Sequence, residues 1–204
     1  MRILITAGPT REPIDPVRFL GNRSSGKLGM ALVTAAIQAG HQATLILGPV
    51  DITPPPEIRT IHVETTAQMQ AAVLREFPSH DVLIMAAAVA DYRPKTVAAQ
   101  KLGRSGPMTL ELEPTEDIVA AATQSKRPDQ KVIGFSLEAE SDLARAREKL
   151  TRKKLDMIVF NPLRTMNSPT ISASLLGSDG TEEDLPEQDK QSFARTLIAR
   201  ISGH

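Results

Sequence analysis

The chain of 204 residues has no cysteine, no tryptophan, one tyrosine, five phenylalanines and no net charge. Without cysteine there is no disulfide, no thiolate nucleophile and no zinc site with sulfur ligands. The balance of 24 basic and 24 acidic residues creates no electrostatic field that would attract nucleic acid or a membrane surface. The scarcity of aromatic rings also disfavours base-stacking surfaces. We therefore expect no nucleic acid and no membrane among its partners.

Metal-ligand clusters and membrane-spanning segments are missing as well. The four histidines, at positions 41, 62, 80 and 204, lack the spacing of a metal site. We therefore predict no metal held by protein ligands alone. No apolar run approaches the length that crosses a membrane, and the first residues have a strand pattern rather than that of a signal peptide. These features lead us to expect a cytoplasmic protein.

What the sequence does contain is an alternation of strand-like and helix-like segments. Strands are expected at residues 2–7, 42–48, 59–64, 81–88, 108–113, 131–138, 155–161, 171–176 and 181–185, and helices at 26–40, 65–77, 117–124, 141–154 and up to Ile201. The pattern predicts an α/β fold, a Rossmann-like three-layer sandwich with a mostly parallel sheet, a C-terminal antiparallel hairpin and a final helix. No linker interrupts it, so residues 1–204 are expected to form a single domain.

A long polar segment, GPTREPIDPVRFLGNRSSGKLG at 8–29, follows the first strand. We expect Ser24 or Ser25 to cap the next helix, whose free N–H groups near Gly26 would form an anion site. The GxxxxGK pattern ends in Leu28 instead of serine or threonine and does not follow the strand directly, which disfavours a P-loop. The GxGxxG fingerprint of dinucleotide sites is absent after Gly8. The alternative is a surface loop with a capped helix behind it.

Ligands of doubly wound sheets bind outside the carboxyl ends of the strands. This rule selects the segments 8–25, 86–104, 136–141 and 161–170. The second begins with small residues, which let a ligand approach the backbone, and continues with Asp91, Lys95, Lys101 and Arg104 on a glycine-containing stretch. That stretch could close over a triphosphate, or it could be a solvated basic loop.

A run of basic residues marks the helix predicted at 141–154. Lys149 and Lys153 are four residues apart and therefore share a helical face. Spacing alone favours a solvated surface for this run, with a binding role as the alternative.

Together these stretches resemble the phosphopantothenoylcysteine synthetase family, the synthetase part of bacterial coenzyme A biosynthesis flavoproteins. The matching motifs, in family order, are AGPTREPIDPVRFLGNRSSGKLG (7–29), AAAVADYR (86–93), Lys101, DIV (117–119), VIGF (132–135), and Lys149 with KKLD (153–156). The resemblance implies a ligase that joins 4′-phosphopantothenate to the amino group of L-cysteine. CTP would be cleaved to CMP and pyrophosphate through an acyl cytidylate, in a homodimer with shared active sites.

The resemblance also implies residue roles. Asn22 would hold the acyl cytidylate, and Lys101 on a flexible flap would neutralise phosphate charge. With the anion site of Gly8, Ser24, Ser25 and Gly26, the nucleotide would be surrounded by Asp91, Lys101, Glu116, Asp117, Ile118, Val119, Phe135, Lys149 and Lys153. The phosphopantothenate pocket would comprise Asn22, Ala87 and Ala88, and Asp15 and Arg18 would complete the pocket of the neighbouring subunit. Mg²⁺ is expected to bind through the triphosphate, because this ion rarely has an all-protein cage.

Three departures from the family pattern stand out. The flap, often K-x-K-K, reads Lys101-Leu-Gly-Arg104 here, so one charge is lost. Glu116 stands where a proline is common. The usual upstream flavin-binding decarboxylase domain is absent from this chain, so we expect a stand-alone enzyme or an excised domain, without flavin.

Two other functions compete with the ligase. A short-chain-dehydrogenase-like enzyme needs Tyr-x-x-x-Lys, but the only tyrosine, Tyr92, has Lys95 three residues on and Thr96 at the fourth position. A nucleotide-binding regulator without activity remains open, although Asn22 and Lys101 argue against it. ATP in place of CTP also remains open, because some relatives use it.

Overall fold

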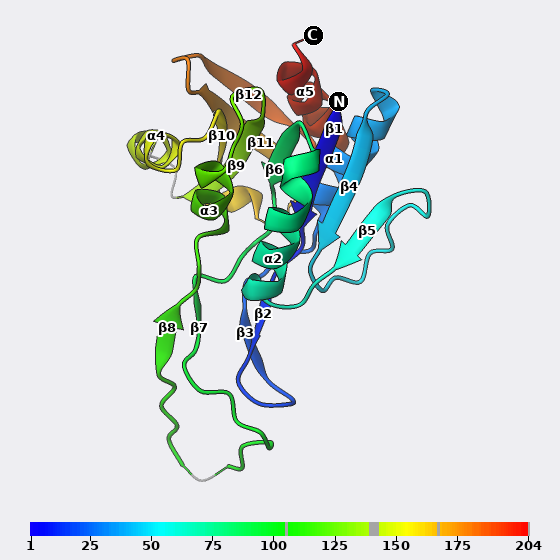
Figure 1. The fold of residues 1–204 in the computed structure, drawn as a ribbon. Coiled ribbons are helices and arrows are strands. Elements are labelled where there is room, and N and C mark those ends of the chain that lie inside the picture. The colour runs from blue at the N-terminus through cyan, green and yellow to red at the C-terminus, as the bar shows by residue number, and fades with distance from the viewer. Residues whose placement is uncertain (105, 139–142, 167, 204) are drawn as a thin grey trace.

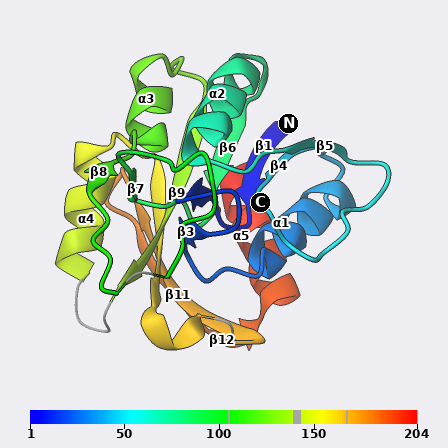
Figure 2. The ribbon, with the colours of Figure 1, turned by 90° about the horizontal axis from the view of Figure 1, so that it is seen from below.

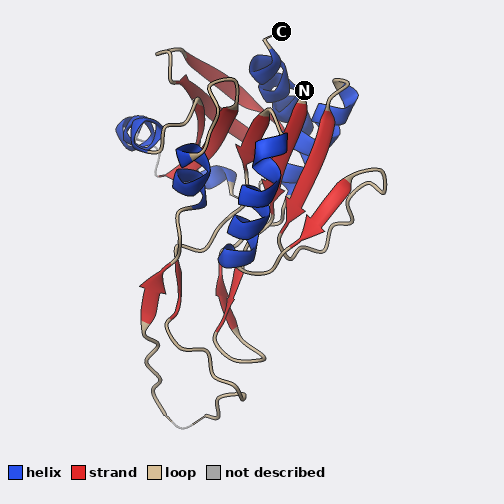
Figure 3. Cartoon of the chain, in the orientation of Figure 1, coloured by secondary structure: helices blue, strands red, loops and turns tan. Residues whose placement is uncertain are grey.

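A computed structural model describes residues 1–104, 106–138, 143–166 and 168–203, and a mixed eight-stranded sheet forms its centre (Figures 1 and 3). The strands are β1 (Arg2–Ala7), β4 (Gln42–Leu47), β5 (Arg59–His62), β6 (Val82–Met85), β9 (Lys131–Glu138), β10 (Met157–Pro162), β11 (Thr170–Gly177) and β12 (Glu182–Asp189). Their order is β12-β11-β10-β9-β6-β1-β4-β5. The six strands from β10 to β5 in this order are parallel, and β11 and β12 are added antiparallel at one edge. The predicted fold class is confirmed.

Helices cover both faces of the sheet (Figure 2). One face carries α1 (Lys27–Gln38) and α5 (Lys190–Ser202), and the other carries α2 (Thr66–Glu76), α3 (Ile118–Gln124) and α4 (Leu143–Arg152). Side chains of β1 alternate between the layers: Ile3 and Ile5 pack under α1, whereas Leu4 packs under α2. All three are fully buried, as expected for a parallel strand covered on both faces. Single 3₁₀ turns occur at Phe77–Ser79 and Leu163–Thr165.

Helices α1 and α2 differ in how their N-termini are capped. Helix α2 begins with a capping box, because the Thr65 hydroxyl accepts the Gln68 N–H and the Gln68 side chain accepts the Thr65 N–H. The prediction that Ser24 or Ser25 caps α1 is wrong. Its N-cap is Gly26, with a left-handed φ of 71° and no side-chain cap. The glycine supplies a backbone conformation that serine rarely adopts.

Helix α1 packs closely against β1. A Cβ on Gly29 would lie 2.3 Å from the Cβ of Ala7, so a glycine in the first turn lets the helix rest directly on the strand. The Ser24 hydroxyl instead accepts a long hydrogen bond of 3.4 Å from the Gly26 N–H.

Two antiparallel ribbons project from the carboxyl ends of the parallel strands (Figure 1). Strands β2 (Arg11–Pro13) and β3 (Phe19–Gly21) form a hairpin within the first long loop, which sequence reasoning did not predict. Strands β7 (Tyr92–Pro94) and β8 (Leu112–Pro114) form the base of a longer arm. We call residues 11–21 the hairpin and residues 92–104 with 106–114 the arm. In place of the strand predicted at 108–113, the structure has only the short strand β8. Its partner β7 lies in the segment 86–104, for which no strand was predicted.

Parts of three predicted segments lie outside the described residues. They are positions 141 and 142 of the helix, 139–141 of the loop at 136–141, and 167 of the loop at 161–170. Within the described residues, no helix combines the length and apolar character that crossing a membrane requires.

Candidate active site

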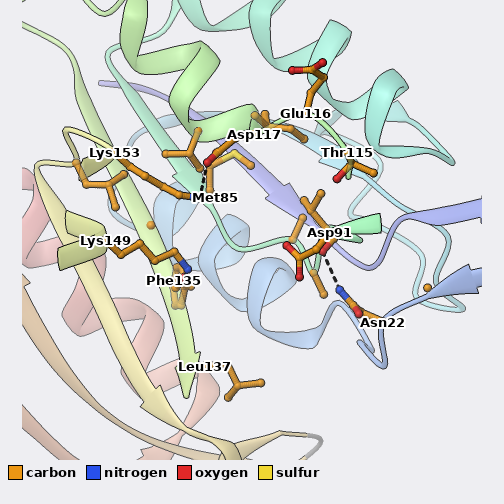
Figure 4. Close-up of a pocket in the computed structure, with 18 of the residues that line it drawn as sticks. Asn22, Met85, Asp91, Thr115, Glu116, Asp117, Phe135, Leu137, Lys149 and Lys153 are labelled. Atoms are coloured by element: carbon orange, nitrogen blue, oxygen red, sulfur yellow. Dashed lines mark hydrogen bonds and ion pairs between the residues drawn. The ribbon is translucent and has the colours of Figure 1, made fainter. Parts of the chain in front are cut away.

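A cleft of about 800 Å³ opens at the carboxyl ends of β6 and β9, where the ligand site of such sheets is expected (Figure 4). Its lining is drawn from the end of β3, the segment after β6, the start of α3, strand β9 and the end of α4. The lining residues are Gly21, Asn22, Arg23, Met85, Ala87, Ala88, Val89, Asp91, Thr115, Glu116, Asp117, Ile118, Val119, Gly134, Phe135, Leu137, Lys149, Lys153, Leu155 and Met166. Eleven of these lining residues are predicted site residues, namely Asn22, Ala87, Ala88, Asp91, Glu116, Asp117, Ile118, Val119, Phe135, Lys149 and Lys153.

Asn22 forms one wall of this cleft with the segment that follows β6. The Asn22 Nδ2 donates a hydrogen bond of 2.8 Å to the carbonyl oxygen of Val89 (Figure 4). The amide nitrogen carries two protons, so the second one and the Oδ1 atom are available to a ligand. Asp91 lies exposed beside Asn22 on the same wall.

The opposite wall carries Lys149 and Lys153, which both face the cleft rather than forming a fully solvated surface. The Lys153 Nζ lies 2.8 Å from the Asp117 Oδ2, and the Lys149 Nζ donates to the carbonyl of Phe135 at 3.0 Å. Asp117 also caps α3 by accepting the Ala120 N–H. Desolvation raises the pKa of Asp117, but the hydrogen bonds from Lys153 and Ala120 outweigh it, so the pKa is lowered overall.

A smaller cleft of about 210 Å³ adjoins the first at the N-terminus of α1. Ser24, Ser25 and Gly26, the residues of the predicted anion site, line it, and it shares Ala87 and Ala88 with the larger cleft. Gly8 lines neither cleft. It lies behind Gly26, where a left-handed φ of 78° turns the chain after β1.

Lys190, the first residue of α5, lines the smaller cleft and was not predicted as a site residue. Desolvation lowers the pKa of Lys190, and the positive charge of Lys27 lowers it further. Lys190 is distant in sequence from the other residues of this cleft and belongs to no motif. Its place in the cleft follows from the packing of α5 against α1.

The two clefts differ in charge. The larger one is lined by three basic residues, Arg23, Lys149 and Lys153, and by three acidic ones, Asp91, Glu116 and Asp117. The smaller is lined by Arg23, Lys27 and Lys190 without an acidic residue among those described. Polyanionic groups would therefore be stabilised in the smaller cleft, next to the N–H groups of α1.

Three predicted site residues lie elsewhere, on the hairpin and the arm. The Asp15 carboxylate is fully buried and pairs with the Arg18 guanidinium at 3.0 Å. Burial raises the pKa of Asp15, but backbone N–H groups of Val17, Leu102 and Arg18 and the Arg18 charge outweigh this effect and lower it. Lys101 is exposed on the arm and lines neither cleft.

Neither a dehydrogenase site nor a metal site is found among the described residues. Tyr92, which a dehydrogenase would need, is 54% exposed on the arm and outside both clefts. In the described part of the chain, no group of three or more histidine, aspartate or glutamate residues is placed to hold a metal ion.

Comparison with known proteins identifies relatives of this chain. The family model for the DNA/pantothenate metabolism flavoprotein C-terminal domain matches residues 1–204. The coenzyme A biosynthesis bifunctional protein CoaBC of Vibrio cholerae is 42% identical over 209 residues, covering 98% of this chain and 52% of that protein. A cysteine/cysteine sulfinic acid decarboxylase from an unknown prokaryotic organism is 47% identical over 165 residues, covering 80% and 46%. The crystal structure of the CoaBC C-terminal domain matches with a TM-score of 0.86 and 39% identity, covering 99% and 94%.

The chain spans about half the length of the two curated relatives, so their names describe longer proteins. The family model, in contrast, matches from the first residue to the last, and the CoaBC C-terminal domain is matched over nearly its whole length. The chain belongs to the family of the DNA/pantothenate metabolism flavoprotein C-terminal domain.

Proposed function

We propose that this protein is a phosphopantothenate–cysteine ligase of coenzyme A biosynthesis, which forms 4′-phosphopantothenoylcysteine with cleavage of CTP to CMP and pyrophosphate. The observation that carries the proposal is the convergence of eleven predicted nucleotide and substrate residues on one cleft. They come from distant segments of the chain, and the sheet topology alone selects this position for a ligand. The similarity to CoaBC, named for coenzyme A biosynthesis, supports the substrate class.

The first step is attack of the phosphopantothenate carboxylate on the α-phosphorus of CTP. A carboxylate oxygen forms a bond to phosphorus, and the bond to the bridging oxygen breaks, releasing pyrophosphate. Such transfer depends on positioning and charge stabilisation more than on covalent catalysis. The larger cleft suits the nucleoside and acyl group, and the smaller, uniformly basic cleft suits the β- and γ-phosphates.

The second step is attack of the cysteine amine on the acyl carbon, which expels CMP and forms the amide after loss of a proton. Asn22 is suited to hold the acyl cytidylate, because its amide is fixed by Val89 and keeps one proton to donate. Lys149 and Lys153 supply positive charge on the opposite wall. Neither step changes an oxidation state, so we expect no flavin. The need for a nucleoside triphosphate supports a cytoplasmic location.

Mg²⁺ is expected to enter with CTP. This ion is usually bound by one or two carboxylates together with substrate phosphates, and Asp91 is an exposed carboxylate on the cleft wall. When bound, Mg²⁺ would neutralise charge on the phosphates.

A homodimer with shared active sites is part of the proposal. Asp15, Arg18 and Lys101 lie on the hairpin and arm rather than in the cleft of their own chain. Six of the eleven large apolar side chains exposed on the described surface belong to these two ribbons, namely Val17, Phe19, Tyr92, Val97, Met108 and Leu112. Such a concentration is typical of a contact surface. A second copy, docked by a two-fold axis, would receive these residues at its cleft.

Pyrophosphate release tests the proposed reaction. The assay contains 4′-phosphopantothenate and Mg²⁺ with either CTP or ATP, each with and without cysteine. We expect release that requires phosphopantothenate and is faster with CTP. Faster release with ATP would correct the nucleotide, and no release with either nucleotide from folded protein would overturn the ligase and favour a binding function.

A further inference from the structure

The wall segment 88–91 is held by hydrogen bonds at both ends. The Ala88 N–H donates to the Gly8 carbonyl at 2.9 Å, and the Thr10 N–H donates to the Ala88 carbonyl at 3.2 Å. At the other end, the Thr115 N–H donates to the Asp91 carbonyl at 2.9 Å. The segment is therefore a fixed part of the cleft rather than a free loop.

One peptide unit in this segment is bound from both sides. The carbonyl of Val89 accepts from Asn22 Nδ2 at 2.8 Å, and the N–H of the same peptide unit, that of Ala90, donates to Thr10 Oγ1 at 2.9 Å. In a trans peptide the carbonyl and the N–H point in opposite directions. Thr10 and Asn22 thus hold one peptide plane between them, and rotation of that plane would move the Asn22 amide.

The Thr10 hydroxyl is also part of a closed ring of hydrogen bonds. It lies 3.0 Å from the Thr66 hydroxyl, which in turn lies 3.4 Å from the Ala90 carbonyl. Each hydroxyl has one proton. Thr66 donates its proton to the Ala90 carbonyl, which leaves Thr10 as the donor between the two hydroxyls, while the Thr10 oxygen accepts from the Ala90 N–H. The ring runs from Ala90 through both threonines and back to Ala90.

Burial makes this ring hard to replace. Thr10 is fully buried, and Thr66 and Ala90 are 2% and 3% exposed. The backbone of Thr66 is fixed as well, since its N–H donates to the buried Glu12 carboxylate at 2.7 Å. Where water has no access, a donor that loses its acceptor stays unsatisfied, so the peptide rotates or the segment shifts.

We propose that Thr10 is a positioning residue for the ligase reaction: its hydroxyl fixes the Val89–Ala90 peptide and thereby the Asn22 amide that faces the substrates. The inference rests on the proposed function, in which Asn22 holds the acyl cytidylate. It assigns Thr10 no contact with substrate. Its effect is on the rate of the chemical step, because a displacement of about 1 Å at a reacting group can cost about a hundredfold in rate.

The test compares Thr10→Val, Thr10→Ser and Thr44→Val in the pyrophosphate assay. Thr44 is a matched control: it is also buried, and its hydroxyl is hydrogen-bonded to His80 at 3.0 Å, on a part of β4 that lines neither cleft. We expect Thr10→Val to lower kcat by about ten- to a hundredfold with less than about a threefold change in the KM for CTP. Thr10→Ser, which keeps the hydroxyl, should restore kcat to within about threefold. Thr44→Val should keep the wild-type kcat although its melting temperature falls as in Thr10→Val.

A double-mutant cycle separates positioning from general destabilisation. If Thr10 acts through Asn22, then Thr10→Val added to Asn22→Ala lowers kcat by less than about twofold further. A full additional loss, or a wild-type kcat in folded Thr10→Val, would overturn the proposal. Should Thr10→Val fail to fold, Thr66→Val opens the same ring at its other hydroxyl, and an unchanged kcat in that variant would also overturn it. An inactive wild type would instead reject the proposed ligase.

Discussion

The carboxylate of Asp15 accepts a hydrogen bond of 3.1 Å from the backbone N–H of Leu102, the residue directly after Lys101. The Arg18 guanidinium donates to the Leu102 carbonyl at 3.0 Å, so both polar groups of Leu102 are held by an ion pair on the hairpin. A third bond runs from the Ala98 N–H to the Ile14 carbonyl. The hairpin therefore sets the position of the arm, and Asn22 directly follows that hairpin in the chain.

Replacing Asp15 should release the arm without unfolding the sheet. In Asp15→Asn, the amide accepts more weakly than a carboxylate and loses the ion pair with Arg18. We expect hydrogen exchange at the Leu102 amide to accelerate by at least about tenfold while the amides of β1 keep their protection. Asp179→Asn is the control, because Asp179 likewise accepts a backbone N–H, that of Thr181, in the distant β11–β12 turn. Equal Leu102 exchange in both variants would show that the hairpin does not hold the arm.

Asn22→Asp should impair the reaction without impairing the fold. The carboxylate cannot donate to the Val89 carbonyl and would face phosphate groups with a negative charge. Because Asn22 is exposed, the melting temperature should stay within a few degrees of wild type. We expect the steady-state rate of pyrophosphate release to fall by at least about a hundredfold. An unchanged rate would remove Asn22 from the mechanism.

Lys101→Gln should leave CTP binding weak but measurable and nearly abolish pyrophosphate release. The reason is that the positive charge of Lys101 is needed most when negative charge develops on the leaving pyrophosphate, and less when the nucleotide binds. Arg93→Gln serves as the control for arm stability, since Arg93 is paired with Glu113 at 2.8 Å at the base of the same arm. We expect this control to keep most of the activity. Wild-type release by Lys101→Gln would refute the assignment of Lys101.

Lys190 is expected to make CTP binding depend on pH. Desolvation and the charge of Lys27 place the pKa of Lys190 below the ordinary value of 10.5. Its positive charge is therefore lost, as pH rises, earlier than that of a solvated lysine. If it binds the phosphates, the KM for CTP should rise in that alkaline range, and Lys190→Gln should have a raised, pH-independent KM. Lys131→Gln, which removes a lysine bound to the Ile201 carbonyl, should retain the wild-type profile. A wild-type profile in Lys190→Gln would exclude Lys190 from the phosphate site.

The features that the sequence predicts well are those with local causes. Thr65 and Gln68 are three residues apart, so the start of α2 can be read directly from the sequence. The start of α1 cannot, because Ser24 and Ser25 are equally good caps in isolation, whereas the N-cap is the left-handed Gly26 and the helix lies directly on Ala7 at Gly29. The hairpin was missed since its strands are short and mostly exposed, with no alternation to detect.

The same distinction holds for the site. Motif residues such as Asp91 and Phe135 converge on the cleft because the topology rule places the ends of parallel strands together. The function of Thr10 depends on Thr66 and Ala90, which are 56 and 80 positions away. No spacing in the sequence carries that information, because it arises only when three segments meet.

The strand order has a consequence for how the chain acquires its structure during synthesis. Of these strands β1 is made first, and β4, β5 and β6 can join it once the chain as far as Met85 has emerged; afterwards β9, β10, β11 and β12 are added in chain order at a single edge. Domains commonly fold from the N-terminus while translation continues, and here no strand has to wait for a later one to fill a gap. The apolar side of α1 is the exception, because α5, at the end of the chain, covers it. A ribosome-bound intermediate ending before residue 190 would hence carry a nearly complete sheet and one uncovered helix face, where chaperone binding is expected.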